Sequence, residues 1–122
     1  MFGIVTFKHQ TGVSGGQPVY GFFMQDTPDQ YDADDRTSEA VLVFTGADPI
    51  SRINVGDAVR VTGSISEFRP GGASSANLTT TEINAADAGI SLVSSGNALP
   101  PVTIVGIGGR TAPSEVIDAD PG

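Results

Sequence analysis

The sequence has 122 residues and a net charge of −8, with 16 glycines, 8 prolines and no cysteine. This length is typical of a single domain, and a hydrophobic content of 39% excludes a chain that is disordered by composition. The lack of cysteine excludes disulfides and thiolate-bound metals, and no apolar run reaches the roughly 20 residues of a membrane-spanning helix. Only six lysines and arginines are present, which argues against the broad basic surface of a tight, non-specific nucleic-acid binder.

The first half of the chain is predicted to form three strands. A β-rich run over residues 2–7 predicts the first, and a glycine-rich loop is expected over 11–18. The densest aromatic run, residues 19–26, predicts the second strand. An acidic loop is expected over 27–39, and the continuous apolar run at 40–44 predicts a buried third strand.

Alternation of apolar and polar residues is clearest over residues 58–68, which predicts a further strand. Val59, Val61 and Ile65 are expected to face the core. Gly63 falls in this inward series, where a barrel strand often needs a bend or a close approach of another backbone.

The last part of the chain is expected to add short strands at residues 78–83 and 90–93, and an extended segment at 102–105. Residues 84–89 allow at most one helical turn. No segment sustains an apolar period of 3.6 residues, so the pattern predicts five to seven short strands in a small barrel or sandwich.

The expected domain organisation is a barrel over residues 1–105 and a linker over 106–122. The linker is rich in glycine and acidic residues and includes two prolines, and we expect it to lead into a further domain.

Several stretches resemble one family. Residues 21–26 read G-F-F-M-Q-D, residues 38–46 resemble the strand that follows in that family, and residues 55–68 contain V-G-D-A-V-R-V-T-G. Residues 95–100 and 109–118 resemble the exit from the same module. In this order the motifs are similar to the OB-fold module of ExeM/NucH-type extracellular endonucleases, over nearly the whole chain.

Two loops depart from the family pattern. The acidic loop at 26–35 has the aspartates but none of the usual glycines, and the loop at 70–76 is rich in glycine and serine rather than aromatic. The second departure argues against base stacking by that loop.

The resemblance implies an all-β fold, a small five-stranded Greek-key OB barrel with a C-terminal extended tail. In the family a catalytic domain of the endonuclease/exonuclease/phosphatase class lies C-terminal to this module. The resemblance therefore implies a secreted bacterial protein in which the present chain is not itself an enzyme but presents nucleic acid to a downstream nuclease domain. The alternative is a structural or protein-interaction spacer that docks on its own catalytic domain.

Candidate nucleic-acid-binding residues follow from the way OB barrels bind single strands, with aromatic platforms and basic residues that contact phosphates. The candidates are Tyr20, Phe22, Lys8, Arg52, Arg60 and Arg69. Core packing is the alternative for the two aromatic residues, and pairing with Glu67 or Asp57 is the alternative for Arg60. Because the net charge repels nucleic acid, we expect binding of single-stranded DNA to be weak and strongly salt-dependent.

A cation site is the second candidate, because hard cations such as Ca²⁺ take several oxygen ligands and aspartates cluster in the acidic loop. Asp29, Asp32 and Asp34 are the candidate ligands, although their spacing is not that of an EF-hand. The alternative to a cation site is a solvated, self-repelling loop. A cation site in this loop would also allow a third function, that of a Ca²⁺-stabilised adhesion module. The single histidine, His9, has no catalytic partners in the sequence and is expected to be a non-catalytic surface residue.

Overall fold

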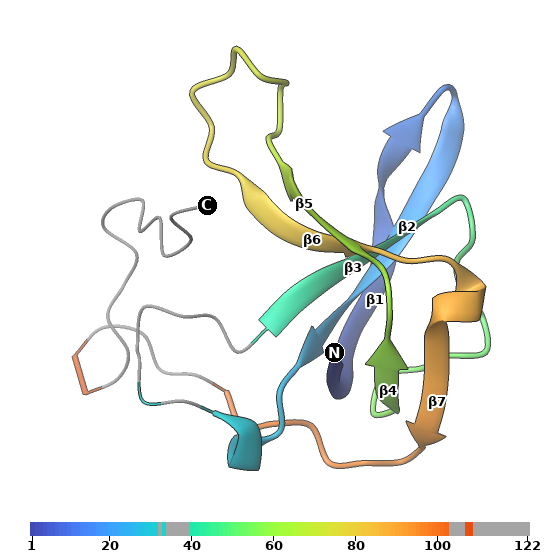
Figure 1. Ribbon diagram of the computed structural model, residues 1–122, viewed down its shortest axis with the longest axis vertical. Helices are drawn as coiled ribbons and strands as arrows, with labels where there is room; N and C mark the ends of the chain where they lie inside the picture. Colours follow the sequence, from blue (N-terminus) through green and yellow to red (C-terminus); the bar gives the residue numbers. More distant parts are fainter. Residues whose placement is uncertain (32, 34–39, 103–106, 109–122) are drawn as a thin grey trace.

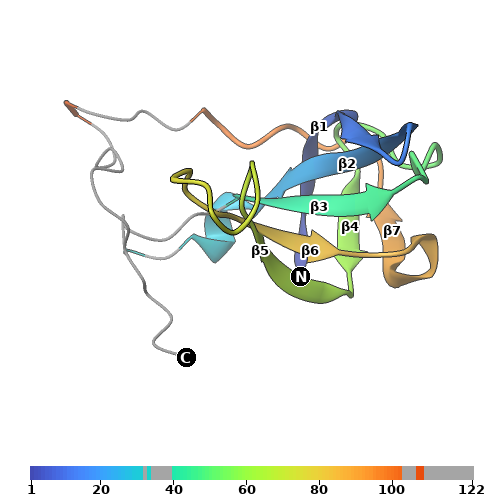
Figure 2. The ribbon, with the colours of Figure 1, turned by 90° about the horizontal axis from the view of Figure 1, so that it is seen from above.

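The computed structural model describes residues 1–31, 33, 40–102 and 107–108 of the chain. The described residues form one mixed seven-stranded sheet that curls into a half-barrel (Figures 1 and 2). Two short 3-10 helices, η1 (Pro28–Gln30) and η2 (Asp87–Gly89), lie between strands. The strands are β1 (Phe2–Ser14), β2 (Gln17–Gln25), β3 (Ala40–Gly46), β4 (Ala58–Val61), β5 (Ser64–Phe68), β6 (Thr80–Asn84) and β7 (Ile90–Ser94). The prediction of an all-β fold is confirmed.

The order of the strands explains why the sheet curls. The order is β5-β6-β3-β2-β1-β4-β7, and all neighbours are antiparallel except the parallel pair β3 and β6. In this order β4 and β5 lie towards opposite ends of the sheet, yet only Thr62 and Gly63 separate them along the chain. A flat sheet cannot satisfy that connection, so the two ends must approach each other.

The prediction of one continuous strand over 58–68 is wrong at its centre. The strand is interrupted at Thr62 and Gly63. There the Thr62 N–H donates to the carbonyl of Gly89 (2.8 Å), and a Cβ on Gly63 would lie 2.2 Å from the carbonyl oxygen of Asn84. The prediction that Gly63 marks a close approach of another backbone is therefore confirmed.

The loop predicted at 11–18 is also wrong, because most of it belongs to a long hairpin. β1 and β2 pair from Ile4 and Gln25 out to Ser14 and Gln17. The connecting residues Gly15 and Gly16 both have positive φ, +59° and +80°, which suits a two-residue turn of the type that glycine pairs favour.

The later elements agree with their predictions within a few residues. β6 and β7 correspond to the strands predicted at 78–83 and 90–93. The short helix η2 is the single turn allowed within 84–89. The extended segment predicted at 102–105 and the linker predicted at 106–122 lie, except for residues 102, 107 and 108, outside the described residues. No helix in the described part of the chain is long and apolar enough to cross a membrane.

The hydrophobic core lies on the inner face of the curled sheet. Its members are Val5, Phe22, Met24, Val43, Ile50, Ile53, Val59, Val61, Ile83, Ala85 and Ile90. Val59 and Val61 are buried as predicted, whereas Ile65 is 76% exposed. Ile65 pairs with the buried Ile83, so it lies on the inner side of the sheet but beyond the part that the core covers.

Candidate nucleic-acid interface

A ladder of three aromatic rings lies on the outer face of β1 and β2. The ring centroids of Phe7 and His9 are 5.0 Å apart, and those of His9 and Phe23 are 5.5 Å apart with parallel planes. Phe7 is 55% exposed at one end of the ladder, and the other two rings are half-buried. We call Phe7, His9 and Phe23 the aromatic ladder.

A β-bulge creates this ladder. The register of β1 against β2 shifts between Val5 and Phe7, so that Val5 faces the core and Phe7, two residues later, faces outward. Phe7 then lies opposite Phe23, and His9 lies opposite Gly21, which has no side chain to separate the imidazole from the neighbouring Phe23 ring. Without the bulge, strand alternation would place Phe7 on the same face as Val5.

His9 is half-buried within this stack rather than a freely exposed surface residue. Its Nδ1 atom is buried and has no hydrogen-bond partner among the described residues. No acidic or basic side chain bonds to His9 in the described part of the chain. On this face it therefore serves as a planar ring between two phenyl rings.

The two aromatic candidates from the sequence lie elsewhere on β2. Phe22 is 1% exposed and belongs to the core, so it is not available to a ligand. Tyr20 is half-buried opposite Gly46 of β3. Of the two adjacent phenylalanines, Phe23 is therefore the one that faces outward.

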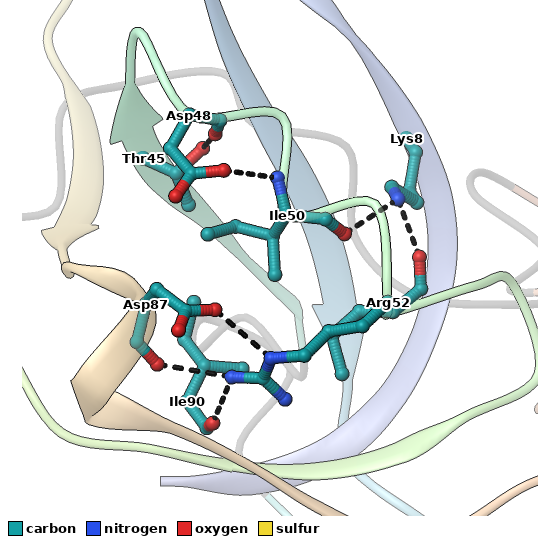
Figure 3. A network of polar contacts seen from close by, with 8 residues as sticks. Lys8, Thr45, Asp48, Ile50, Arg52, Asp87 and Ile90 are labelled. Atoms are coloured by element: carbon teal, nitrogen blue, oxygen red, sulfur yellow. Dashed lines mark hydrogen bonds and ion pairs between the residues drawn. The ribbon is translucent and has the colours of Figure 1, made fainter.

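Lys8 and Arg52 hold the β3–β4 loop, residues 47–57 (Figure 3). The Lys8 ammonium donates to the carbonyls of Ile50 (3.0 Å) and Ile53. The Arg52 guanidinium donates to the carboxylate of Asp87 (2.9 Å), to its carbonyl (3.0 Å) and to the carbonyl of Ile90 (2.6 Å). Both cations therefore bind this protein's own backbone.

The geometry of the loop explains why it needs these donors. Ile50 has φ of +47°, a conformation that is costly for a β-branched residue. Asp48 steadies it by accepting the Ile50 N–H (2.8 Å), while the Thr45 hydroxyl donates to the Asp48 carbonyl (2.6 Å). The strained turn delivers Ile50 and Ile53 into the core.

Arg69 and Arg60 lie on other parts of the fold. Arg69 donates to the carbonyls of Ser75 (3.4 Å) and Asn77 within the β5–β6 loop. Arg60 is exposed on β4, and within the described residues its side chain has no hydrogen bond or ion pair. Neither of the acidic partners expected for it forms a hydrogen bond or ion pair with it there.

Those two acidic residues have other partners. Asp57 is buried and accepts the N–H of Asn54 (2.8 Å). Glu67 accepts a hydrogen bond from the hydroxyl of Thr81. The structure thus leaves Arg60 as the described arginine most available to a phosphate.

Of the candidate calcium ligands, only Asp29 lies within the described residues, where it is exposed in η1. Asp32 and Asp34 lie outside them. No group of three or more histidine or acidic side chains suited to a metal ion occurs in the described part of the chain.

No family model, curated protein or solved structure matches this chain.

The role of Lys8 can be measured directly. The Lys8→Met substitution keeps the apolar stem of the side chain but removes both charge-assisted bonds to the β3–β4 loop. Each such bond contributes roughly 1.5–3 kcal/mol to the stability of the folded state. We expect the free energy of unfolding in urea to fall by about 3 kcal/mol, with little change in the salt dependence of oligonucleotide binding. A salt slope that drops by about one unit while stability is unchanged would instead make Lys8 a phosphate contact.

Proposed function

We propose that the chain is a five-stranded Greek-key OB barrel extended by β7. β1 pairs with both β2 and β4, β2 pairs with β3, and β3 runs parallel to β6. If residues 58–68 are counted as one interrupted strand, that strand pairs with β1 through β4 and with β6 through β5. This connectivity supports a partly open five-stranded barrel of the OB type.

We propose further that the barrel is a non-catalytic accessory module of a secreted bacterial endonuclease. In this proposal it binds single-stranded nucleic acid and presents it to a catalytic domain downstream. The sequence resemblance supports the parent protein, and the aromatic ladder is the observation that carries the binding role. Base–aromatic stacking contributes roughly 1–3 kcal/mol per base and tolerates any sequence.

The charge distribution sets the expected strength of this binding. With a net charge of −8, and with Lys8, Arg52 and Arg69 bonded to backbone carbonyls, the barrel offers few cations to phosphates. Stacking therefore has to supply most of the affinity, while Arg60 remains available for a phosphate contact. We expect dissociation constants in the micromolar range or weaker, rising as salt is added.

The proposal is tested by fluorescence anisotropy of a labelled single-stranded oligonucleotide at low salt, with and without Ca²⁺. Phe7→Ala should weaken binding about tenfold, because it removes the most exposed ring of the ladder. Phe68→Ala is the matched control: Phe68 is 53% exposed, close to the 55% of Phe7, but it lies on β5, which β6 and β3 separate from β2 in the sheet order. Equal losses in the two variants would contradict a site at the ladder.

A spacer that docks on its own catalytic domain is the second candidate. The observation in its favour is that Lys8, Arg52 and Arg69 all donate to carbonyls of this chain. No saturable binding at high micromolar protein, with or without Ca²⁺, would favour the spacer over the nucleic-acid module.

A further inference from the structure

Among the described strands, β5 is the last at one end of the sheet, and its outer edge has no partner strand there. Within the described residues β5 pairs only with β6, and Ser64 lies opposite Asn84. The N–H of the next residue, Ala85, donates to Phe44 of β3, so the backbone groups of Asn84 point the other way, to Ser64. Since these groups alternate along a strand, those of Ile65 and Glu67 point away from β6.

None of the described strands pairs with β5 along the edge beside this part of the inner face. Ile65 shares that face with Ile83, its direct partner across the ladder. Ile83 is 7% exposed and belongs to the core, whereas Ile65 is 76% exposed. A residue with the orientation of a core side chain is thus left in water at the position where a neighbouring strand would cover it.

The direction in which β1 points at its N-terminal end leads along the same edge of β5. β1 pairs with β4 from Ile4 to Phe2, and its last contacts are reciprocal bonds between the backbones of Met1 and Val61, both 2.7 Å. Val61 and Ile65 are four residues apart on the interrupted strand, so their backbone groups point to the same edge. A strand that continued the register of β1 past Met1 would run beside Ile65 and Glu67.

We propose that the free edge of β5 is an acceptor site for one further extended polypeptide strand. This strand lies antiparallel to β5 and in line with β1, and pairs with the backbone groups of Ile65 and Glu67. Its side chains alternate, with the apolar ones on the inner face over Ile65. Such strand addition takes its affinity from main-chain hydrogen bonds and its specificity from alternate side chains.

The test uses the full chain carrying an N-terminal extension of alternating valine and threonine, set so that the valines fall on the inner face. Amide hydrogen exchange at Ile65 and Glu67 should slow at least about tenfold relative to the unextended protein, and the midpoint of thermal unfolding should rise. The matched control inserts one additional threonine directly before Met1. This slip turns every valine outward and should cancel the gain in the midpoint of unfolding.

Three results would overturn the proposal. One is an extension in the correct register that leaves both amides exchanging as before. Another is slow exchange at both amides in the unextended protein at every concentration, because the edge would then already be filled by this chain. The third is slow exchange that appears only as the unextended protein is concentrated, which would make the occupant a second copy.

Discussion

Phe22→Ala is expected to remove a large fraction of the protein's free energy of unfolding. Phe22 is 1% exposed and packs in the core with Met24 and Val43. Truncating a buried phenylalanine costs about 3–5 kcal/mol, because apolar contacts are lost and a cavity remains. That is a large fraction of the total stability of a small domain, which is about 5–15 kcal/mol. Urea denaturation followed by circular dichroism measures the loss.

Phe23→Ala is the matched control, one residue along the same strand. Phe23 is half-buried on the outer face, in the stack with His9. We expect this variant to stay folded, with a loss of about 1 kcal/mol, and to bind single-stranded oligonucleotide more weakly. If Phe23→Ala lowers the free energy of unfolding more than Phe22→Ala does, the assignment of inner and outer faces on β2 is reversed.

This pair also marks the limit of what could be predicted from the sequence. The aromatic run predicts β2, because β-branched and aromatic residues favour strands. It does not fix the face, since Phe22 and Phe23 put an aromatic ring in both phases of the alternation. The face is decided by register: Phe22 lies opposite the buried Val43, and Phe23 lies opposite Leu42.

The aromatic ladder could not be predicted for a related reason. A strict period of two places Phe7 on the same face as Val5, in the core. The bulge between them moves Phe7 outward, and no glycine at that point signals it. The one available signal was that Phe7 and His9 are two residues apart, which places their rings on one face of any regular strand.

The cationic candidates show how long-range contacts escape a sequence pattern. Lys8 and Arg52 look like free surface cations in the sequence, but Lys8 reaches carbonyls more than forty positions away, and Arg52 reaches across to β7. The prediction that Val59 and Val61 face the core implies that Arg60, which lies between them, points outward, and Arg60 is indeed exposed. Local alternation thus predicts orientation, whereas the partners of a long side chain depend on the fold.

Gly63→Ala is expected to be strongly destabilising. The added Cβ would lie 2.2 Å from the Asn84 carbonyl oxygen and 3.0 Å from the Ile83 Cγ2 atom. The first contact is with backbone, so no side-chain rotation relieves it, and one of the two strands must move. Overpacking of this kind costs about 3 kcal/mol. Gly12→Ala is the control, because its Cβ would meet nothing nearer than Val19, at 4.0 Å.

The location of Gly63 also predicts which strands are loosened by the Gly63→Ala substitution. It joins β4 to β5, and so connects the two regions of the sheet that the curl brings together. Moving β5 away from Asn84 weakens the β5–β6 pairing but leaves the β1–β2 hairpin untouched. In Gly63→Ala, amide exchange should therefore accelerate first in β5 and β6. Uniform acceleration across all strands would contradict this prediction and would show that the curled sheet unfolds as one cooperative unit.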